Sequence, residues 1–274
     1  MEFPDGNPGP PRGVDRSLWT GWPRSMLLAL VLLLIVSNFA VQYLAYGMGA
    51  GDFGSVIAGG LVGVIFPLWL IGARRGPAFL ADLGLDRPRP AVLALSSVMA
   101  LAAIYPTSLL AELSLRIFPP TEAWVLLANE SLPQSSNEIV VAAATALLVA
   151  PLVEEIIFRG LLQRLVATYL GEGQGMIYAA AVFGVIHMQL WSLFGLIGVG
   201  LVLGFIFRAT RSVTACILAH ALHNAVSLSV MVGTGPSTYE PNSVTGSQAW
   251  ITGISLAVLL VAGADLWRER DRTT

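Results

Sequence analysis

Hydrophobic residues occur along this chain in long runs, and short segments between the runs hold most of the polar and charged residues. A helix that crosses a bilayer needs roughly 20 apolar residues. We count eight candidate spans: Met26 to Tyr46, Gly54 to Ala73, Ala91 to Ala111, Ile139 to Leu162, Gly175 to Gln189, Trp191 to Phe207, Val213 to Val232 and Trp250 to Ala264. The pattern predicts an all-α fold, a polytopic transmembrane helical bundle with about eight spans.

The segments outside the runs set the domain limits. We expect residues 1–25, rich in Pro and Gly, to form a disordered cytoplasmic tail, residues 26–267 to form one transmembrane domain, and residues 268–274 to form a short cytoplasmic tail. The first apolar run is longer than the core of a signal peptide, so we treat it as a retained span. The stretch from Glu122 to Leu132 either lies along the membrane interface or forms an ordinary surface loop.

The composition is that of a membrane protein, and the positions of the arginines predict its orientation in the membrane. Of the 274 residues 55% are hydrophobic and 12% are charged, and the mean hydropathy is +0.72, which is too apolar for a soluble globule. With the amino terminus inside, 13 of the 15 arginines fall in cytoplasmic segments and only Arg116 falls outside. The positive-inside rule therefore predicts cytoplasmic termini, in a multi-pass protein of a cell membrane, which we expect to be a bacterial plasma membrane.

Ionisable residues inside the membrane are confined to three of the eight spans. Placing such a group at membrane depth costs at least about 2.5–3.5 kcal/mol, so these groups usually face a protein-lined cavity and serve a function. The residues are Glu154, Glu155, Arg159, His187, His220 and His223. Depths estimated from helical rise allow these spans to share a cavity on the cytoplasmic half.

Helical spacing divides these residues into groups. Glu155 and Arg159 are four residues apart and can pair, which leaves Glu154 free to project into the cavity. Pro151 removes a backbone donor three residues earlier and is expected to kink this helix and admit water.

The other two spans supply histidine and amide groups. Phe183, expected to serve packing, shares a helix face with His187. His220 and Asn224 share a face on another helix, where both can donate hydrogen bonds to one oxygen, and His223 flanks them.

These three motifs, E-E-x-x-x-R, F-x-x-x-H and H-x-x-x-N, on separate membrane helices in this order, resemble those of the CPBP family. This family comprises the eukaryotic type II CAAX prenyl endopeptidases and their bacterial relatives, including bacteriocin-processing and ABI-type proteins. The resemblance covers about residues 137–232 and implies an intramembrane glutamic endopeptidase.

The resemblance also implies roles for individual residues. Glu154 becomes the general base on water, His187 its water-positioning partner, and Glu155 with Arg159 its support. His220 and Asn224 become the oxyanion donors. His223 matches no fixed position of the motif and is retained as an accessory candidate.

The sequence leaves open whether the reaction uses a metal ion and whether the protein is a protease. We favour a reaction without a cofactor, because the H-E-x-x-H pattern is absent, but a zinc ion held by Glu154, His187 and His220 would make the enzyme a metalloprotease. The alternatives to a protease are a proton-coupled transporter and a non-catalytic membrane scaffold or immunity protein. As partners we expect the lipid bilayer and a peptide or protein substrate, lipidated or plain, and no nucleic acid.

Overall fold

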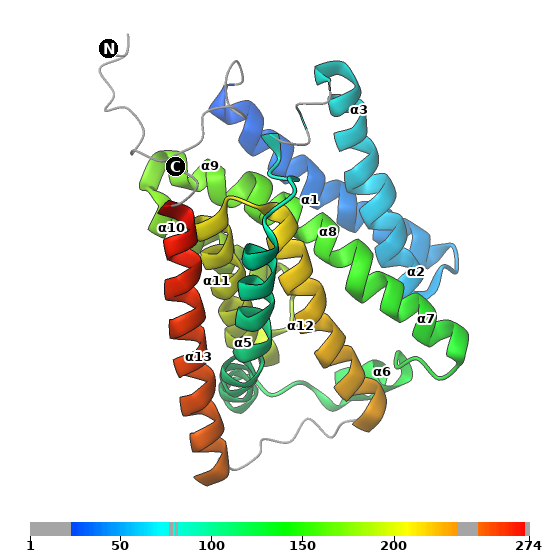
Figure 1. Cartoon of the computed structure of the whole chain (residues 1–274). Helices are drawn as coiled ribbons and strands as arrows, with labels where there is room; N and C mark the ends of the chain where they lie inside the picture. Colours follow the sequence, from blue (N-terminus) through cyan, green and yellow to red (C-terminus); the bar gives the residue numbers. More distant parts are fainter. Residues whose placement is uncertain (1–22, 77–78, 80–81, 235–245, 272–274) are drawn as a thin grey trace, which may run out of the picture.

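The computed structural model describes residues 23–76, 79, 82–234 and 246–271. All regular secondary structure in these ranges is helical, which confirms the predicted all-α class (Figure 1). The expected disordered tail lies almost entirely outside the described residues, as does the end of the expected carboxyl-terminal tail.

Seven segments of the described chain are long and apolar enough to cross a membrane. Four are single helices and three combine several helical elements. The single helices are α1 (Arg24–Gly47), α5 (Pro90–Ile117), α12 (Val213–Thr234) and α13 (Gly246–Asp271). The composite segments are α2 (Gly51–Ala58), η2 (Gly59–Ile65) and α3 (Phe66–Arg75); α7 (Ser136–Ala144), η3 (Thr145–Val149), α8 (Ala150–Glu155), η4 (Ile156–Gln163) and α9 (Arg164–Leu170); and η5 (Leu190–Ser192) with α11 (Leu193–Thr210).

The fifth predicted span is shorter than the others. It corresponds to α10 (Glu172–Ile186), whose 15 residues reach about 22 Å, against about 30 Å for the hydrocarbon core. The helix stops at His187, and the next residue, Met188, has a left-handed backbone with φ 55°. His187 therefore stands at the end of α10, where the chain changes direction.

The segment before α7 forms a short helix, α6 (Glu122–Glu130), at the opposite end of the bundle from the last turn of α13 (Figure 1). Thr121 caps it by accepting a hydrogen bond from the Trp124 backbone, and Leu126 and Leu127 are exposed. A tryptophan and exposed leucines on one short helix are typical of a membrane interface.

Glycines allow the helices around the site to pack closely. A Cβ atom added to Gly195 would lie 2.9 Å from the Thr107 carbonyl oxygen of α5, and one added to Gly200 would lie 2.9 Å from the Cα of Ala180 in α10. Small residues of this kind let membrane helices approach one another. Helix α11 is thereby held between α5 and α10, with its backbone close to Arg159 of η4.

Candidate active site

The segment that carries the two adjacent glutamates is a short α-helix, α8, between two π-helical stretches, η3 and η4. In η3 the Ala150 amide bonds five residues back, to the Thr145 carbonyl. In the same register the Ala146 carbonyl would need the amide of Pro151, which has no hydrogen. The Nδ2 of Asn224 in α12 donates to that carbonyl instead, at 2.9 Å.

Pro151 is thus accommodated by a π-helical turn within one helical segment that runs from Ser136 to Leu170. The amide of Asn224 replaces the missing backbone donor. Turns of the π type are frequent at functional sites, because they change the direction in which the following side chains point. Here they set the orientation of Glu154 and Glu155.

Glu155 and Arg159 form the ion pair expected from their spacing. The Arg159 Nη1 lies 2.7 Å from the Glu155 Oε1, and both side chains are fully buried. The Nη2 of Arg159 donates to the Gly200 carbonyl in α11 at 2.9 Å. The same Oε1 of Glu155 lies 2.8 Å from the Nδ1 of His220. Glu155 is therefore held by two nitrogen donors from two helices.

Phe183 forms a buried wall of this cluster. Its ring lies 5.0 Å from the guanidinium carbon of Arg159 and packs against the rings of His187 and His220, with centroids 4.6 and 5.9 Å away. Phe158 packs edge-on against the same ring. The packing role expected for Phe183 agrees with these contacts, and the aromatic wall excludes water from the Glu155–Arg159 pair.

Glu154 projects away from this pair, and two imidazoles lie beside it. Its Oε2 is 3.9 Å from the Nε2 of His187 and 3.9 Å from the Nε2 of His220, and the side chain is 24% exposed. This oxygen is buried and has no hydrogen-bond partner among the described residues. Two helices other than its own thus supply the groups nearest to the Glu154 carboxylate.

The hydrogen bonds of the two histidines determine which ring nitrogen faces Glu154. His187 Nδ1 lies 2.6 Å from the Phe183 carbonyl, which can only accept, so Nδ1 carries the hydrogen. His220 Nδ1 likewise donates to the paired carboxylate of Glu155. In a neutral imidazole the other nitrogen, Nε2, is then an acceptor. The Nε2 of each ring therefore faces Glu154, as an acceptor when the ring is neutral and as a donor when the ring is protonated.

The remaining candidates are placed differently from one another. His220 and Asn224 lie on one face of α12, but their hydrogen bonds go to different acceptors, Glu155 and Ala146. Asn224 retains a second amide hydrogen, because its NH₂ group has two. His223 is half-buried beside the Ala100 backbone of α5. His223 therefore flanks the cluster without contacting Glu154 or Glu155.

The spacing around Glu154 does not match a zinc site. Within the described ranges no group of three or more His, Cys, Asp or Glu side chains is arranged to hold a metal ion. Zinc bonds of about 2.0–2.1 Å across the 3.9 Å gaps would open to an angle of about 145°, compared with about 109° in a tetrahedral site. The donor types suit zinc, but this arrangement would have to close to bind it.

Sequence reasoning missed the contribution of α11. The carbonyls of Gly200 and Gly204 accept hydrogen bonds from Arg159 and Gln163, each at 2.9 Å. The spacing Gly-x-x-x-Gly is a signal for close helix packing and could have identified this face. This spacing could not have shown that side chains of η4 donate hydrogen bonds to the carbonyls on that face.

One comparison with known proteins gives a match. Residues 136–226 match the model of a family described as type II CAAX prenyl endopeptidase Rce1-like. No curated protein and no solved structure matches the chain significantly. The match begins in α7 and ends in α12, so it covers Glu154, Glu155, Arg159, His187, His220 and Asn224. It confirms the similarity to the CPBP family over about a third of the chain, and the matched family consists of membrane proteases.

Proposed function

We propose that this multi-pass membrane protein is an intramembrane endopeptidase that hydrolyses a peptide bond with a water activated by Glu154. The proposal rests on the different environments of the two adjacent carboxylates. Each has a buried Oε2 without a hydrogen-bond partner among the described residues, but the Oε1 of Glu155 is held by Arg159 and His220, whereas Glu154 has no such ion pair and its Oε2 lies 3.9 Å from two imidazole nitrogens. The match to a protease family supports this function over a transporter or a scaffold.

The separation of Glu154 and His187 matches that of two groups bridged by one water molecule. Two hydrogen bonds of about 2.8 Å span their 3.9 Å separation with an angle of about 90° at the water oxygen. Glu154 takes a proton from this water while the water oxygen attacks the peptide carbonyl carbon. Glu154 later delivers that proton to the leaving amine. His187 orients the water through Nε2, and its Nδ1 bond to the Phe183 carbonyl fixes the ring.

For the oxyanion we propose His220 and Asn224 as donors. Asn224 uses one amide hydrogen for the Ala146 carbonyl, which orients the group and leaves the second hydrogen for substrate. His220 donates through Nε2 when it is protonated. With that proton, the two glutamates, Arg159 and His220 carry no net charge together, which lowers the cost of burying the cluster.

We propose that the reaction requires no metal ion, in line with the wide spacing of Glu154, His187 and His220. The test is elemental analysis of purified, active protein together with dialysis against a chelator. Full activity in metal-free protein is expected. Activity that falls with chelation and returns with stoichiometric Zn²⁺ would contradict the proposal.

For the substrate we propose a peptide with a lipid or a large apolar group near the scissile bond, cut near the arginine-rich end of the bundle in a bacterial plasma membrane. An open apolar cavity of about 520 Å³ lies beside α8, and Leu152 and Ile156 of the catalytic segment form part of its wall. The other lining residues come from η2, α3 and the segment before α5, and none has a charged side chain. Leu152 and Ile156 are each two residues from Glu154 and so lie on the opposite face of the helix, which makes the cavity a place for the apolar group of the substrate and not part of the catalytic space.

The experiment is cleavage of a peptide pair that differs only in a C-terminal isoprenyl thioether, with product analysed by mass spectrometry. Wild type is expected to cut the lipidated member faster. His187→Ala is expected to lose about 10²-fold or more in rate, whereas Glu130→Gln, an exposed carboxylate of α6, is expected to match wild type. Equal rates for wild type and His187→Ala would show that the assigned site is wrong.

A further inference from the structure

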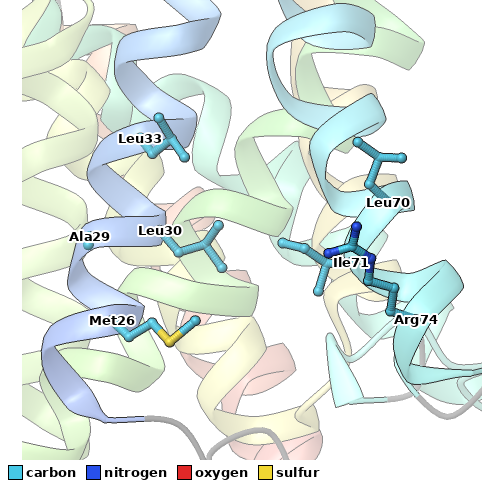
Figure 2. A pocket seen from close by; sticks show the side chains of 7 residues that line it. All are labelled: Met26, Ala29, Leu30, Leu33, Leu70, Ile71 and Arg74. Carbon is cyan, nitrogen blue, oxygen red and sulfur yellow. The ribbon is translucent and has the colours of Figure 1, made fainter.

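A second cavity lies between α1 and α3, away from Glu154 (Figure 2). It has a volume of about 580 Å³ and is lined by Met26, Ala29, Leu30, Leu33, Leu70, Ile71 and Arg74. Figure 2 shows the α1 and α3 side chains on its two facing sides. Six of the seven lining side chains are apolar, and several of them are exposed at the surface of the bundle. Because α1 and α3 belong to segments that are apolar and long enough to cross a membrane, we expect this groove to face the bilayer.

The groove exists because α1 packs closely against η2, the element that precedes α3, and then separates from α3. At η2 a Cβ atom on Gly63 would lie 2.8 Å from the Asn38 backbone, and the Gly63 carbonyl accepts a hydrogen bond from the hydroxyl of Ser37. Helix α1 packs against α2 and η2 but has little contact with α3 (Figure 1). The resulting wedge widens toward the arginine-rich end.

Arg74 lies at the wide end of this wedge and is its one charged lining residue. The side chain is exposed, and it makes no hydrogen bond or ion pair with any residue in the described part of the chain. In Figure 2 its guanidinium group lies next to Ile71 at the edge of the groove. A guanidinium binds a phosphate group through two parallel hydrogen bonds, and arginines near the cytoplasmic surface attract anionic lipids.

We propose that this groove binds one phospholipid with a negatively charged head group, its acyl chain between α1 and α3 and its phosphate on Arg74. The aliphatic wall from Met26 to Leu33 covers about 10 Å of rise, which suits the upper part of an acyl chain. The unpartnered Arg74 selects the anionic head group over a zwitterionic one. The site is separate from the cluster around Glu154, so the proposal does not depend on the peptidase activity.

The test is native mass spectrometry of the purified protein, titrated with phosphatidylglycerol and with phosphatidylcholine carrying the same acyl chains. Wild type is expected to retain phosphatidylglycerol preferentially. Arg74→Gln is expected to bind it about fivefold more weakly, the effect of one arginine near an anionic surface, with little change for phosphatidylcholine. Ile71→Trp, which fills the groove, is expected to lose both lipids.

The matched control is Arg87→Gln, which removes an exposed arginine outside the groove and is expected to keep the wild-type preference. Equal retention of the two lipids by wild type, or unchanged binding by Arg74→Gln, would overturn the proposal. Displacement of the lipid by soluble glycerol phosphate would show a phosphate site without an acyl chain. A dimer that Ile71→Trp abolishes would show that a second copy occupies the groove.

Discussion

At the scale of single residues, two neighbouring glutamates have opposite environments. Glu155 is fully buried and its Oε1 is bound by Arg159 at 2.7 Å and by His220 at 2.8 Å. Glu154 is partly exposed, and its Oε2 lies 3.9 Å from the imidazole nitrogens of His187 and His220. Adjacent residues of a helix point about 100° apart, so the same helix can place one carboxylate in the buried ion pair and the other beside the histidines. Glu155 is therefore a positioning residue, and Glu154 is the candidate base.

Replacing Arg159 with Leu is expected to destabilise the protein by about 3–5 kcal/mol, because it leaves the buried Glu155 carboxylate without its guanidinium partner. Thermal unfolding in detergent, followed by circular dichroism, measures the loss. The double variant Glu155→Gln/Arg159→Leu is expected to recover part of it, since no unpaired charge remains. A double variant less stable than Arg159→Leu alone would contradict this account of the pair.

At the scale of helical elements, the site depends on a break in regular hydrogen bonding. The π-helical turn in η3 leaves the Ala146 carbonyl opposite Pro151, and Asn224 of α12 supplies the donor. The same hydrogen bond joins the glutamate-bearing segment to the helix that carries His220. Asn224 therefore positions the site even before any contact with substrate.

This arrangement predicts coupling between Asn224 and Pro151. Asn224→Ala is expected to cost about 1–3 kcal/mol, because it leaves the Ala146 carbonyl unsatisfied. In the Pro151→Ala background residue 151 has an amide hydrogen, and the cost of Asn224→Ala should fall by about 1 kcal/mol. A double-mutant cycle of unfolding free energies measures this coupling. Additive effects would show that Asn224 does not replace a missing backbone donor.

Gly200 allows a further prediction at this scale. A methyl group there would lie 2.9 Å from the Ala180 Cα and would push α11 away from α10, so Gly200→Ala is expected to destabilise the bundle by about 1–3 kcal/mol. Gly233→Ala is the control, because a Cβ atom at that position meets nothing within 4 Å. Equal melting temperatures for the two variants would argue against close packing at Gly200.

The sequence predicts those features that depend on spacing within one helix. The apolar runs locate the helices, and the spacing of Glu155 and Arg159 predicts their pair, because residues four apart in a helix are neighbours. It does not predict that Glu155 also binds His220 or that Arg159 reaches Gly200, because periodicity contains no information about which helices face each other. The π-helical turns were also missed, since Pro151 alone indicates a kink and not how its lost hydrogen bond is replaced.

At the scale of the whole molecule, one end of the bundle collects the arginines. Arg208 and Arg211 pair there with Glu172, and Arg89 pairs with Glu269 of α13. The start of α1, the end of α3 and the end of α13 lie at this same end (Figure 1). The positive-inside rule predicts that it faces the cytoplasm.

Cysteine labelling tests this orientation. The natural Cys216 is buried, so a membrane-impermeant maleimide should report only on introduced cysteines. Glu130→Cys in α6 is expected to react in intact cells, and Arg268→Cys in α13 is expected to react only after the membrane is opened. The reverse pattern would invert the predicted topology.

The account depends most on Glu154 as the base that activates water. The most direct measurement is the single-turnover cleavage rate of a lipidated peptide by wild type and by Glu154→Gln, which keeps the size of the side chain but cannot accept the proton. We predict a loss of about 10²–10⁴-fold, with unchanged substrate binding and an unchanged melting temperature. A Glu154→Gln variant that cleaves within twofold of the wild-type rate would contradict the proposed mechanism.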